Sequence, residues 1–165
     1  MPNLFKMKKY FHHETAIVET DQIGEGTKIW AWTHISKEVK IGNNCVIGEG
    51  VHIGPNVEIG DNCKIQNHSL IYEGVYIKDN VFLGPNTITT NDYIPSVSTV
   101  DFKKTPRFKK TYFEKGCSIG ANCTIICGVT IGEKSLIGAG SVITKNIPPF
   151  SKSFGNPCRV ITLNK

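Results

Sequence analysis

A large apolar residue, almost always isoleucine, recurs at every sixth position through most of this 165-residue chain. The series runs through Ile17, Ile23, Ile29, Ile35, Ile41, Ile47, Ile53, Ile59, Ile65, Ile71, Ile77 and Leu83, and it resumes with Phe113, Ile119, Ile125, Ile131, Ile137 and Ile143. A period of six matches neither the 3.6-residue period of an amphipathic helix nor the two-residue alternation of an ordinary strand. It is typical of a parallel β-helix, in which each repeat supplies one short strand and one corner. We therefore predict an all-β chain.

Small and β-branched residues occupy a second regular position, two residues before members of the first series. They are Val39, Cys45, Val51, Val57, Cys63, Ser69, Val75, Val81, Cys117, Cys123 and Val129. Turn-forming runs such as Gly42-Asn43-Asn44, Gly54-Pro55-Asn56 and Gly60-Asp61-Asn62 suit corners, where a positive or fixed φ is required. Three hexads, roughly 18 residues, then close a triangular coil that stacks on the next at about 4.8 Å. Each inward isoleucine contributes on the order of 1.5–3 kcal/mol when buried, so the column can stabilise a short chain.

The series is interrupted once, between Leu83 and Phe113, and it resumes in the same phase. We therefore predict a single domain over residues 1–165, with the repeat at about 15–147, an extruded loop at 89–111 and a C-terminal tail at 148–165. Long irregular loops in compact folds are commonly functional or disordered. The loop carries five basic residues, which are either solvated or reach across a subunit boundary to phosphates: Lys103, Lys104, Arg107, Lys109 and Lys110.

Composition narrows the function classes. The formal net charge is +5 and no apolar stretch is long enough to span a bilayer. Residues 1–14 lack an apolar run of the signal-peptide type, so we expect a cytoplasmic protein. The mild positive charge suits anionic small molecules, whereas nucleic-acid binding would require a denser basic face or stacking aromatics.

Four of the six cysteines, Cys45, Cys63, Cys117 and Cys123, fall on the second inward position, and the chain has no C-x-x-C pair. We interpret them as reduced core residues, with a redox or metal role as the alternative.

Residues 18 apart lie on the same face of successive coils, which makes the repeat a guide to a site. The spacing places Glu73 beside Asn91, with Asp92 next in the chain, where the loop leaves the prism. We expect a cleft there, because the departing loop and a neighbouring subunit can enclose it. The alternative is a polar ladder with an Asx turn that caps the loop.

The same spacing pairs His34 with His52, which we interpret as a structural stack on a solvent-facing side of the prism, and Asn67 with Pro85. His68 occupies an outward phase. It is either a surface residue or a general base toward an acceptor amine or hydroxyl.

The repeat from about Thr15 to Ile147 resembles the left-handed β-helix, or hexapeptide-repeat, acyltransferases. The left hand is implied by that resemblance, since spacing alone does not set it and parallel crossovers are usually right-handed. The run KIQNHSLIYEGVYIKDNVFLGPNTITTND, residues 64–92, looks like the core of sugar N-acetyltransferases that act on the 3-amino group of nucleotide-linked amino sugars. The run GANCTIICGVTIGEKSLIGAGSVITKNIPPFSKSFGNPCRVI, residues 120–161, is similar to their acetyl-coenzyme A half.

Two branches of that group are close to this chain. One branch acts on dTDP-3-amino-3,6-dideoxyhexoses in the synthesis of cell-surface glycan precursors. This chain looks more like that branch at Tyr72-Glu73-Gly74 and Thr90-Asn91-Asp92. The alternative branch acts on a UDP-linked 3-amino uronic acid, and Asp92-Tyr93-Ile94-Pro95-Ser96 departs from its usual motif.

The resemblance implies roles for several residues at the sugar end. An amine attacks only when it is neutral and held near the thioester carbonyl. Asp92 and Glu73 would accept hydrogen bonds from the sugar amine and a neighbouring hydroxyl, and Asn91 would bind the amine or the developing oxyanion. The coenzyme A sulfur could take the surplus proton, with His68 as the alternative base. The sugar nucleotide would also contact Asn67, Tyr72 and Tyr93.

At the coenzyme A end, the resemblance implies close backbone approach at Gly120, Gly138 and Ala139 and phosphate contacts from Lys145 and Arg159. Arg159 ends the run Gly155-Asn156-Pro157-Cys158-Arg159, which matches the terminal motif of the family. Active sites in this family lie between subunits, so we expect a homotrimer that needs no metal.

A γ-type carbonic anhydrase is the less favoured alternative. It shares the prism but needs three histidines on zinc, and the position five residues after His68 is Glu73.

Overall fold

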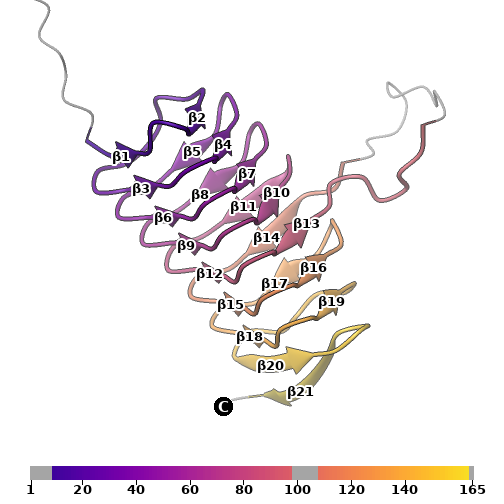
Figure 1. The fold of residues 1–165 in the computed structure, drawn as a ribbon. Coiled ribbons are helices and arrows are strands. Elements are labelled where there is room, and N and C mark those ends of the chain that lie inside the picture. The colour runs from indigo at the N-terminus through magenta and orange to yellow at the C-terminus, as the bar shows by residue number, and fades with distance from the viewer. Residues whose placement is uncertain (1–8, 98–107, 164–165) are drawn as a thin grey trace, which may run out of the picture.

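The computed structural model of the chain describes residues 9–97 and 108–163, and every regular element in these two ranges is a β-strand. The strands form three sheets that are the sides of a prism (Figure 1). The indigo N-terminal coil is at one end of the prism and the yellow C-terminal hairpin is at the other. The prediction of an all-β parallel helix is confirmed, and the six-residue repeat agrees with the left-handed class.

Each coil of the prism contributes one strand to each sheet in turn. Sheet 1 contains β1 (Phe11–His12), β3 (Lys28–Ile29), β6 (Val46–Ile47), β9 (Lys64–Ile65), β12 (Phe82–Leu83), β15 (Ser118–Ile119), β18 (Leu136–Ile137), β20 (Ser151–Phe154) and β21 (Arg159–Leu163). Sheet 2 contains β2 (Ile17–Val18), β4 (His34–Ile35), β7 (His52–Ile53), β10 (Leu70–Ile71), β13 (Ile88–Thr89), β16 (Thr124–Ile125) and β19 (Val142–Ile143). Sheet 3 contains β5 (Lys40–Ile41), β8 (Glu58–Ile59), β11 (Val75–Ile77), β14 (Thr111–Phe113) and β17 (Thr130–Ile131).

We name the edges of the prism by the sheets that meet there, so the 1–2 edge is the row of corners between sheets 1 and 2. Strand pairing along each sheet is parallel, except in the terminal hairpin, where β20 and β21 are antiparallel. Successive strands pair at a spacing of 18 residues over most of the prism, as in Lys40 opposite Glu58 and Val46 opposite Lys64.

The core is the column that the sequence predicts. Ile29, Ile47 and Ile65 are fully buried, as is almost every later member of the isoleucine series. All eleven residues predicted for the second inward position are also buried. Corner residues such as Asn44 and Asn62 have positive φ (54° and 56°), a conformation that asparagine tolerates well.

The sequence pattern is wrong about Ile17, because the first coil is one residue shorter than the later ones. β2 pairs with β4 so that Ile17 is opposite His34 and Val18 is opposite Ile35. Since alternate side chains point to opposite faces of a strand, Val18 lies toward the core and Ile17 points outward, with 60% of its surface exposed.

All six cysteines are free and buried, which confirms the interpretation of four of them, Cys45, Cys63, Cys117 and Cys123, as reduced core residues. The Cys45 thiol donates to the carbonyl of Gly60 at 3.1 Å, and the Cys63 thiol donates to that of Lys78 at 3.1 Å. Burial raises the pKa of the Cys117 thiol to about 12, so that side chain stays neutral.

The loop excursion is present, and it is one residue shorter at each end than predicted. Thr89 ends β13 and Thr111 begins β14, and both are fully buried in the prism. The loop therefore leaves and rejoins the prism at the 2–3 edge. Its central residues 98–107, which include Lys103, Lys104 and Arg107, lie outside the described residues.

Candidate functional site

The 2–3 edge holds the predicted sugar-end residues, on two successive rungs. β10 pairs with β13, and the Tyr72 amide donates to the Thr89 hydroxyl at 3.0 Å. The corner that carries Glu73 therefore lies next to the corner where Asn91 begins the loop. Glu73 is half-buried, and its Oε1 accepts a hydrogen bond from Asn56 Nδ2 at 3.3 Å.

Asp92 is held by the stem of the loop. It forms an antiparallel bridge with Phe108, and the Lys109 amide donates to the Asn91 carbonyl at 3.1 Å. Asp92 Oδ1 accepts a hydrogen bond from the Ile94 amide at 2.9 Å. This is the Asx turn that was the alternative interpretation of Asp92, and it fixes the direction of the carboxylate. Asn91 and Asp92 are both half-buried.

Tyr93 and Lys109 form a cation–π pair on the same stem. The Lys109 ammonium lies 3.5 Å from the centre of the Tyr93 ring, within the range for a favourable contact. The aliphatic part of the Lys109 side chain passes over Gly128, where an added β-carbon would meet Lys109 Cδ at 3.0 Å. The pair joins the outgoing and returning ends of the loop within the described residues.

Tyr72 belongs to an aromatic stack on the outer face of sheet 2. The rings of His34 and His52 are 5.3 Å apart, and those of His52 and Tyr72 are 5.7 Å apart. Glu19 Oε2 lies 3.2 Å from His34 Nε2. Desolvation, followed by the nearby His34, lowers the pKa of His52. The sequence predicts the His34–His52 stack correctly and does not reveal that Tyr72 extends it.

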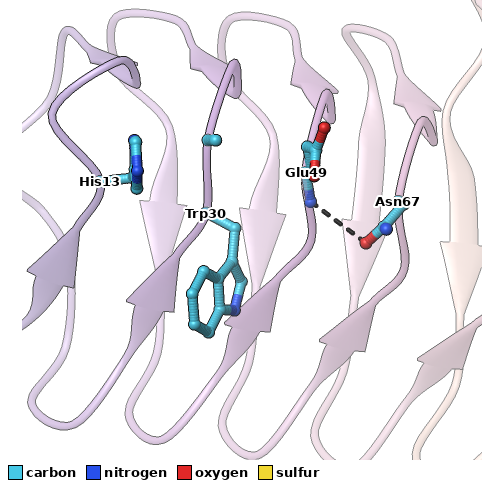
Figure 2. Close-up of a pocket in the computed structure, with 5 residues that line it drawn as sticks. His13, Trp30, Glu49 and Asn67 are labelled. Atoms are coloured by element: carbon cyan, nitrogen blue, oxygen red, sulfur yellow. Dashed lines mark hydrogen bonds between the residues drawn. The ribbon is translucent and has the colours of Figure 1, made fainter.

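The 1–2 edge carries a groove of about 410 Å³ that crosses the first four coils (Figure 2). It is lined by His13, Trp30, Ala31, Glu49 and Asn67, each from a different corner except for the adjacent pair Trp30–Ala31. Sequence reasoning assigns only Asn67 to a site. A signal was present, because the only two tryptophans of the chain, Trp30 and Trp32, lie on one corner.

His68 is on this edge and not with the carboxylates. It occupies a corner position with φ of 59°, and it is exposed. Its backbone amide donates to the Glu49 carbonyl at 2.8 Å. Asn67 beside it accepts a hydrogen bond from the Glu49 amide on Oδ1 at 3.2 Å (Figure 2).

Within one chain, the structure therefore places His68 and Asn67 on one edge and Glu73, Asn91 and Asp92 on another. Sheet 2 separates the two groups.

The glycines predicted to approach coenzyme A lie on the 1–2 edge of the last two coils, and the packing of the chain itself explains them. A β-carbon on Gly120 would be 2.5 Å from the Ala139 amide nitrogen, and one on Gly138 would be 2.8 Å from Phe154 Cβ. Ala139 is exposed at the corner. Glycine at 120 and 138 is thus required for close stacking of successive coils whether or not a ligand binds there.

The two predicted phosphate-binding cations are separate from each other. Lys145 is exposed at the 2–3 edge of the last coil. Arg159 begins β21 in the terminal hairpin, where its Nη1 donates to the carbonyl of Cys158 at 3.2 Å. Of the residues predicted to contact coenzyme A, three share the 1–2 edge of one chain: Gly120, Gly138 and Ala139.

A metal centre has no support in the part of the chain that the structure describes, where no three His, Cys, Asp or Glu side chains gather in a way that could hold an ion. In the same residues, no helix has the length and apolar character needed to cross a bilayer.

The prism and its repeated corners define the hexapeptide β-helix class. Residues 22–55, 38–73 and 56–91 match the family described as bacterial transferase hexapeptide (six repeats), and residues 113–145 match the hexapeptide repeat of succinyl-transferase. The chain is 53% identical over 150 residues to dTDP-3-amino-3,6-dideoxy-alpha-D-galactopyranose 3-N-acetyltransferase of Aneurinibacillus thermoaerophilus, which covers 91% of this chain and 76% of that protein. The chain therefore belongs to the hexapeptide-repeat acyltransferases, as its sequence predicts.

Solved structures agree at the level of the fold. An N-acyltransferase from Bacillus cereus, AntD, in complex with dTDP and coenzyme A has a TM-score of 0.69 at 20% identity, over 94% of this chain and 83% of that one. The GDP-perosamine N-acetyltransferase of Caulobacter crescentus, in complex with coenzyme A and GDP-perosamine, has a TM-score of 0.67 at 20% identity, over 91% of this chain and 55% of that one.

Proposed function

We propose that this protein transfers an acetyl group from acetyl-coenzyme A to the 3-amino group of a dTDP-3-amino-3,6-dideoxyhexose, in the synthesis of cell-surface glycan precursors. The main support is the 53% identity to an enzyme of that named activity, which extends over 91% of the chain. That length includes the two neighbouring corners that carry Glu73 and Asp92 and the late coil that carries Ala139.

The carboxylates of the 2–3 edge suit an amine acceptor. Glu73 and Asp92 attract the sugar amine in its protonated form and orient it by hydrogen bonds, since both are half-buried and anchored by neighbours. The ammonium group first loses one proton to the solvent. The neutral amine then attacks the thioester carbonyl, and Asn91 would bind the amine or the oxyanion. The carbon–sulfur bond then breaks, and the departing sulfur takes the surplus proton. His68 is the alternative acceptor of that proton.

Acetyl-coenzyme A would lie along the 1–2 edge of the last coils. Gly120, Gly138 and Ala139 present an edge without bulky side chains there, and Gly140 at the same corner has nothing within 4 Å of an added β-carbon. Arg159 on the neighbouring hairpin is exposed and suits a phosphate. Lys145 lies on the other edge, so it would serve a coenzyme A molecule bound to the next subunit.

We also propose that the active unit is a homotrimer, because the two groups of site residues lie on opposite edges of sheet 2. The outward positions within the strands of sheet 2 carry no carboxylate, lysine or arginine: Ile17, His34, His52, Leu70, Ile88, Thr124 and Val142. Sheet 1 presents Lys28 and Lys64, and sheet 3 presents Lys40 and Glu58. A threefold arrangement with sheet 2 near the axis brings the 2–3 edge of one copy to the 1–2 edge of the next. A cytoplasmic setting fits the six unpaired thiols.

The test is release of free thiol from acetyl-coenzyme A with a panel of acceptors. The panel holds dTDP-3-amino-3,6-dideoxyglucose, the galacto epimer, the corresponding 4-amino sugar and a UDP-linked 3-amino uronic acid. We expect turnover with a dTDP-linked 3-amino sugar and a product acetylated on nitrogen by mass spectrometry. Turnover with the UDP-linked acid alone would assign the protein to the other branch, and no turnover with any 3-amino sugar would refute the proposal.

A further inference from the structure

We propose that the groove on the 1–2 edge is the subsite for the pyrimidine base of the acceptor, with the base stacked on Trp30 and its imide edge facing Glu49 and Asn67. This inference rests on the proposed function, and it gives roles to Trp30 and Glu49, which the sequence analysis does not assign to any site. The inference is supported by the presence of an exposed indole, a carboxylate and an amide in one groove (Figure 2).

Trp30 supplies a flat apolar surface that the fold itself leaves uncovered. Its indole contacts Phe11 edge-on, with ring centres 5.8 Å apart at 64°, and 45% of its surface remains exposed. Ala31 beside it is small and half-buried, so it adds little bulk to the groove. An exposed indole in a groove is a favourable platform for a nucleobase, because stacking on an aromatic side chain contributes strongly to binding.

The polar groups beside the indole are complementary to an imide. Asn67 uses Oδ1 to accept the Glu49 amide, which fixes the orientation of its side-chain amide and leaves Nδ2 as a donor for a ligand. The Glu49 carboxylate is an exposed acceptor one rung away, at about 4.8 Å by strand spacing. An acceptor beside a donor matches the adjacent N3–H and C4=O of uracil or thymine.

Charge decides which part of the acceptor occupies this groove. The Glu49 carboxylate would repel the diphosphate, so the neutral base fits beside it and the diphosphate must lie further along the edge. His13 at the far end accepts a hydrogen bond from the Thr15 amide on Nδ1 at 3.2 Å. With Nδ1 as the acceptor, Nε2 carries a ring proton and offers one more donor.

Two other grooves in the described residues fit a nucleotide less well. The groove on sheet 3, about 230 Å³, is bordered by Lys40 and Glu58, which already pair at 2.9 Å. The groove of about 540 Å³ at the last coils is lined by two carboxylates, Glu114 and Glu133, and by no aromatic ring.

The place of the groove also fits the geometry of the reaction. It lies on the same edge as Gly120 and Ala139, with five rungs between Ala31 and Ala139, or roughly 24 Å at about 4.8 Å a rung. Acceptor and acetyl donor would lie end to end along one edge, with their reacting ends between Asn67 and Gly120. In the trimer, Glu73 and Asp92 of the next subunit would meet the sugar there.

The two tryptophans give a direct readout. Trp32→Asn leaves Trp30 as the only tryptophan of the full chain, and Trp30→Phe leaves only Trp32. Each protein is titrated with dTDP alone, and intrinsic fluorescence is recorded beside calorimetric binding. We expect saturable quenching in Trp32→Asn with an unchanged Kd, and no saturable quenching in Trp30→Phe.

Two further variants measure the affinity that each group provides. Trp30→Ala should weaken dTDP binding about tenfold or more, and thermal unfolding shows whether it is folded. Asn67→Asp keeps the Oδ1 acceptor for the Glu49 amide, as Asp79 does for the Asp61 amide at 2.9 Å, but loses the Nδ2 donor. It should weaken dTDP binding about tenfold or more. The matched control is Asp61→Asn, the reverse exchange at a ladder position on another edge, which should not change Kd.

The outcomes separate this inference from the proposed function. Unchanged dTDP affinity in folded Trp30→Ala and in Asn67→Asp, without quenching of Trp30, overturns the base subsite even if acetyl transfer to a dTDP-3-amino sugar is normal. Saturable quenching of Trp30 by dTDP supports the subsite, and absence of acetyl transfer in the same preparation then counts against the proposed function alone. A fall in turnover in Asn67→Asp with unchanged dTDP affinity would assign the groove to the sugar and overturn the base subsite.

Discussion

The imidazole of His68 lies over Gly50, where it occupies the space that a β-carbon on residue 50 would need. The two residues hold the same corner position on successive coils, and both have positive φ, 64° at Gly50 and 59° at His68. The side chain of His68 therefore folds along the 1–2 edge toward the groove at Trp30. The positive φ favours glycine at position 50, and the contact with His68 leaves no room for a β-carbon there.

Gly50→Ala should consequently destabilise the protein by more than its backbone strain alone, which is about 1–2 kcal/mol for an alanine forced into this region. The matched control is Gly140→Ala, because Gly140 has φ of 72° at the same corner position of the last coil and nothing within 4 Å of an added β-carbon. Chemical denaturation of both variants isolates the collision with His68. Equal losses of unfolding free energy would show that His68 moves aside without cost.

His68→Asn tests whether His68 is the base. Asparagine suits the positive φ at this corner, as it does at Asn86 and Asn122, so the variant should fold normally. If the departing sulfur takes the proton, kcat should fall by less than about tenfold, whereas loss of a general base typically lowers it about 10²–10⁴-fold. Steady-state kinetics at saturating acetyl-coenzyme A distinguish the two results.

Asp92→Asn separates the chemical role of Asp92 from its structural role. The amide oxygen of asparagine can still accept the Ile94 amide, as Asp92 Oδ1 does at 2.9 Å, so the turn and the melting temperature should be kept. The negative charge toward the sugar amine is lost, and we expect kcat to fall about 100-fold or more. Asp61→Asn on the 3–1 edge is the control for a change of charge. Normal turnover in Asp92→Asn would show that Asp92 has a structural role in the turn and no role in the reaction.

The fold could be predicted from the sequence because a single period governs it. From Ile29 onward, inward residues such as Ile47 and Cys63 repeat in one phase, and this phase is kept after the loop that follows Thr89. Ile17 was misplaced because the shorter first coil shifts the register by one residue, and the isoleucine series alone does not reveal that shift.

The candidate site was only partly predictable. Spacing brings Glu73 next to Asn91 because both lie on one edge. The spacing does not predict a groove at Trp30 and Glu49, because that groove depends on which outward side chains leave space between them. The offset of six residues between Ala139 and Lys145 already implies different edges, and the family resemblance grouped them because it does not say which subunit supplies each residue.

Protonation of His52 should destabilise the protein. Its pKa is lowered in the folded state, first by desolvation and then by His34, so the unfolded state binds more protons as the pH falls. The stability that the neutral ring provides is fully present above the ordinary value of 6.5 and is lost as the pH falls through that value and below it. The groups that face His52 are His34, with Glu19 beyond it, and Tyr72. Unfolding free energies of wild type and His52→Gln between pH 8 and 5 should converge as the pH falls, and parallel curves would contradict the prediction.

Trp32→Asn should stabilise the protein. Trp32 has φ of 58°, a left-handed conformation that costs a bulky residue about 1–2 kcal/mol and costs asparagine much less. Its side chain is 68% exposed, so little burial is lost on replacement, and its amide keeps the hydrogen bond to Thr15 Oγ1 at 3.1 Å. We expect about 1 kcal/mol of added stability by urea denaturation. The reciprocal change Asn122→Trp, at the same corner position with φ of 56°, should lower stability by a similar amount. A loss of stability in Trp32→Asn would mean that the indole makes a contact worth more than its backbone strain, as it would at an interface with the next subunit.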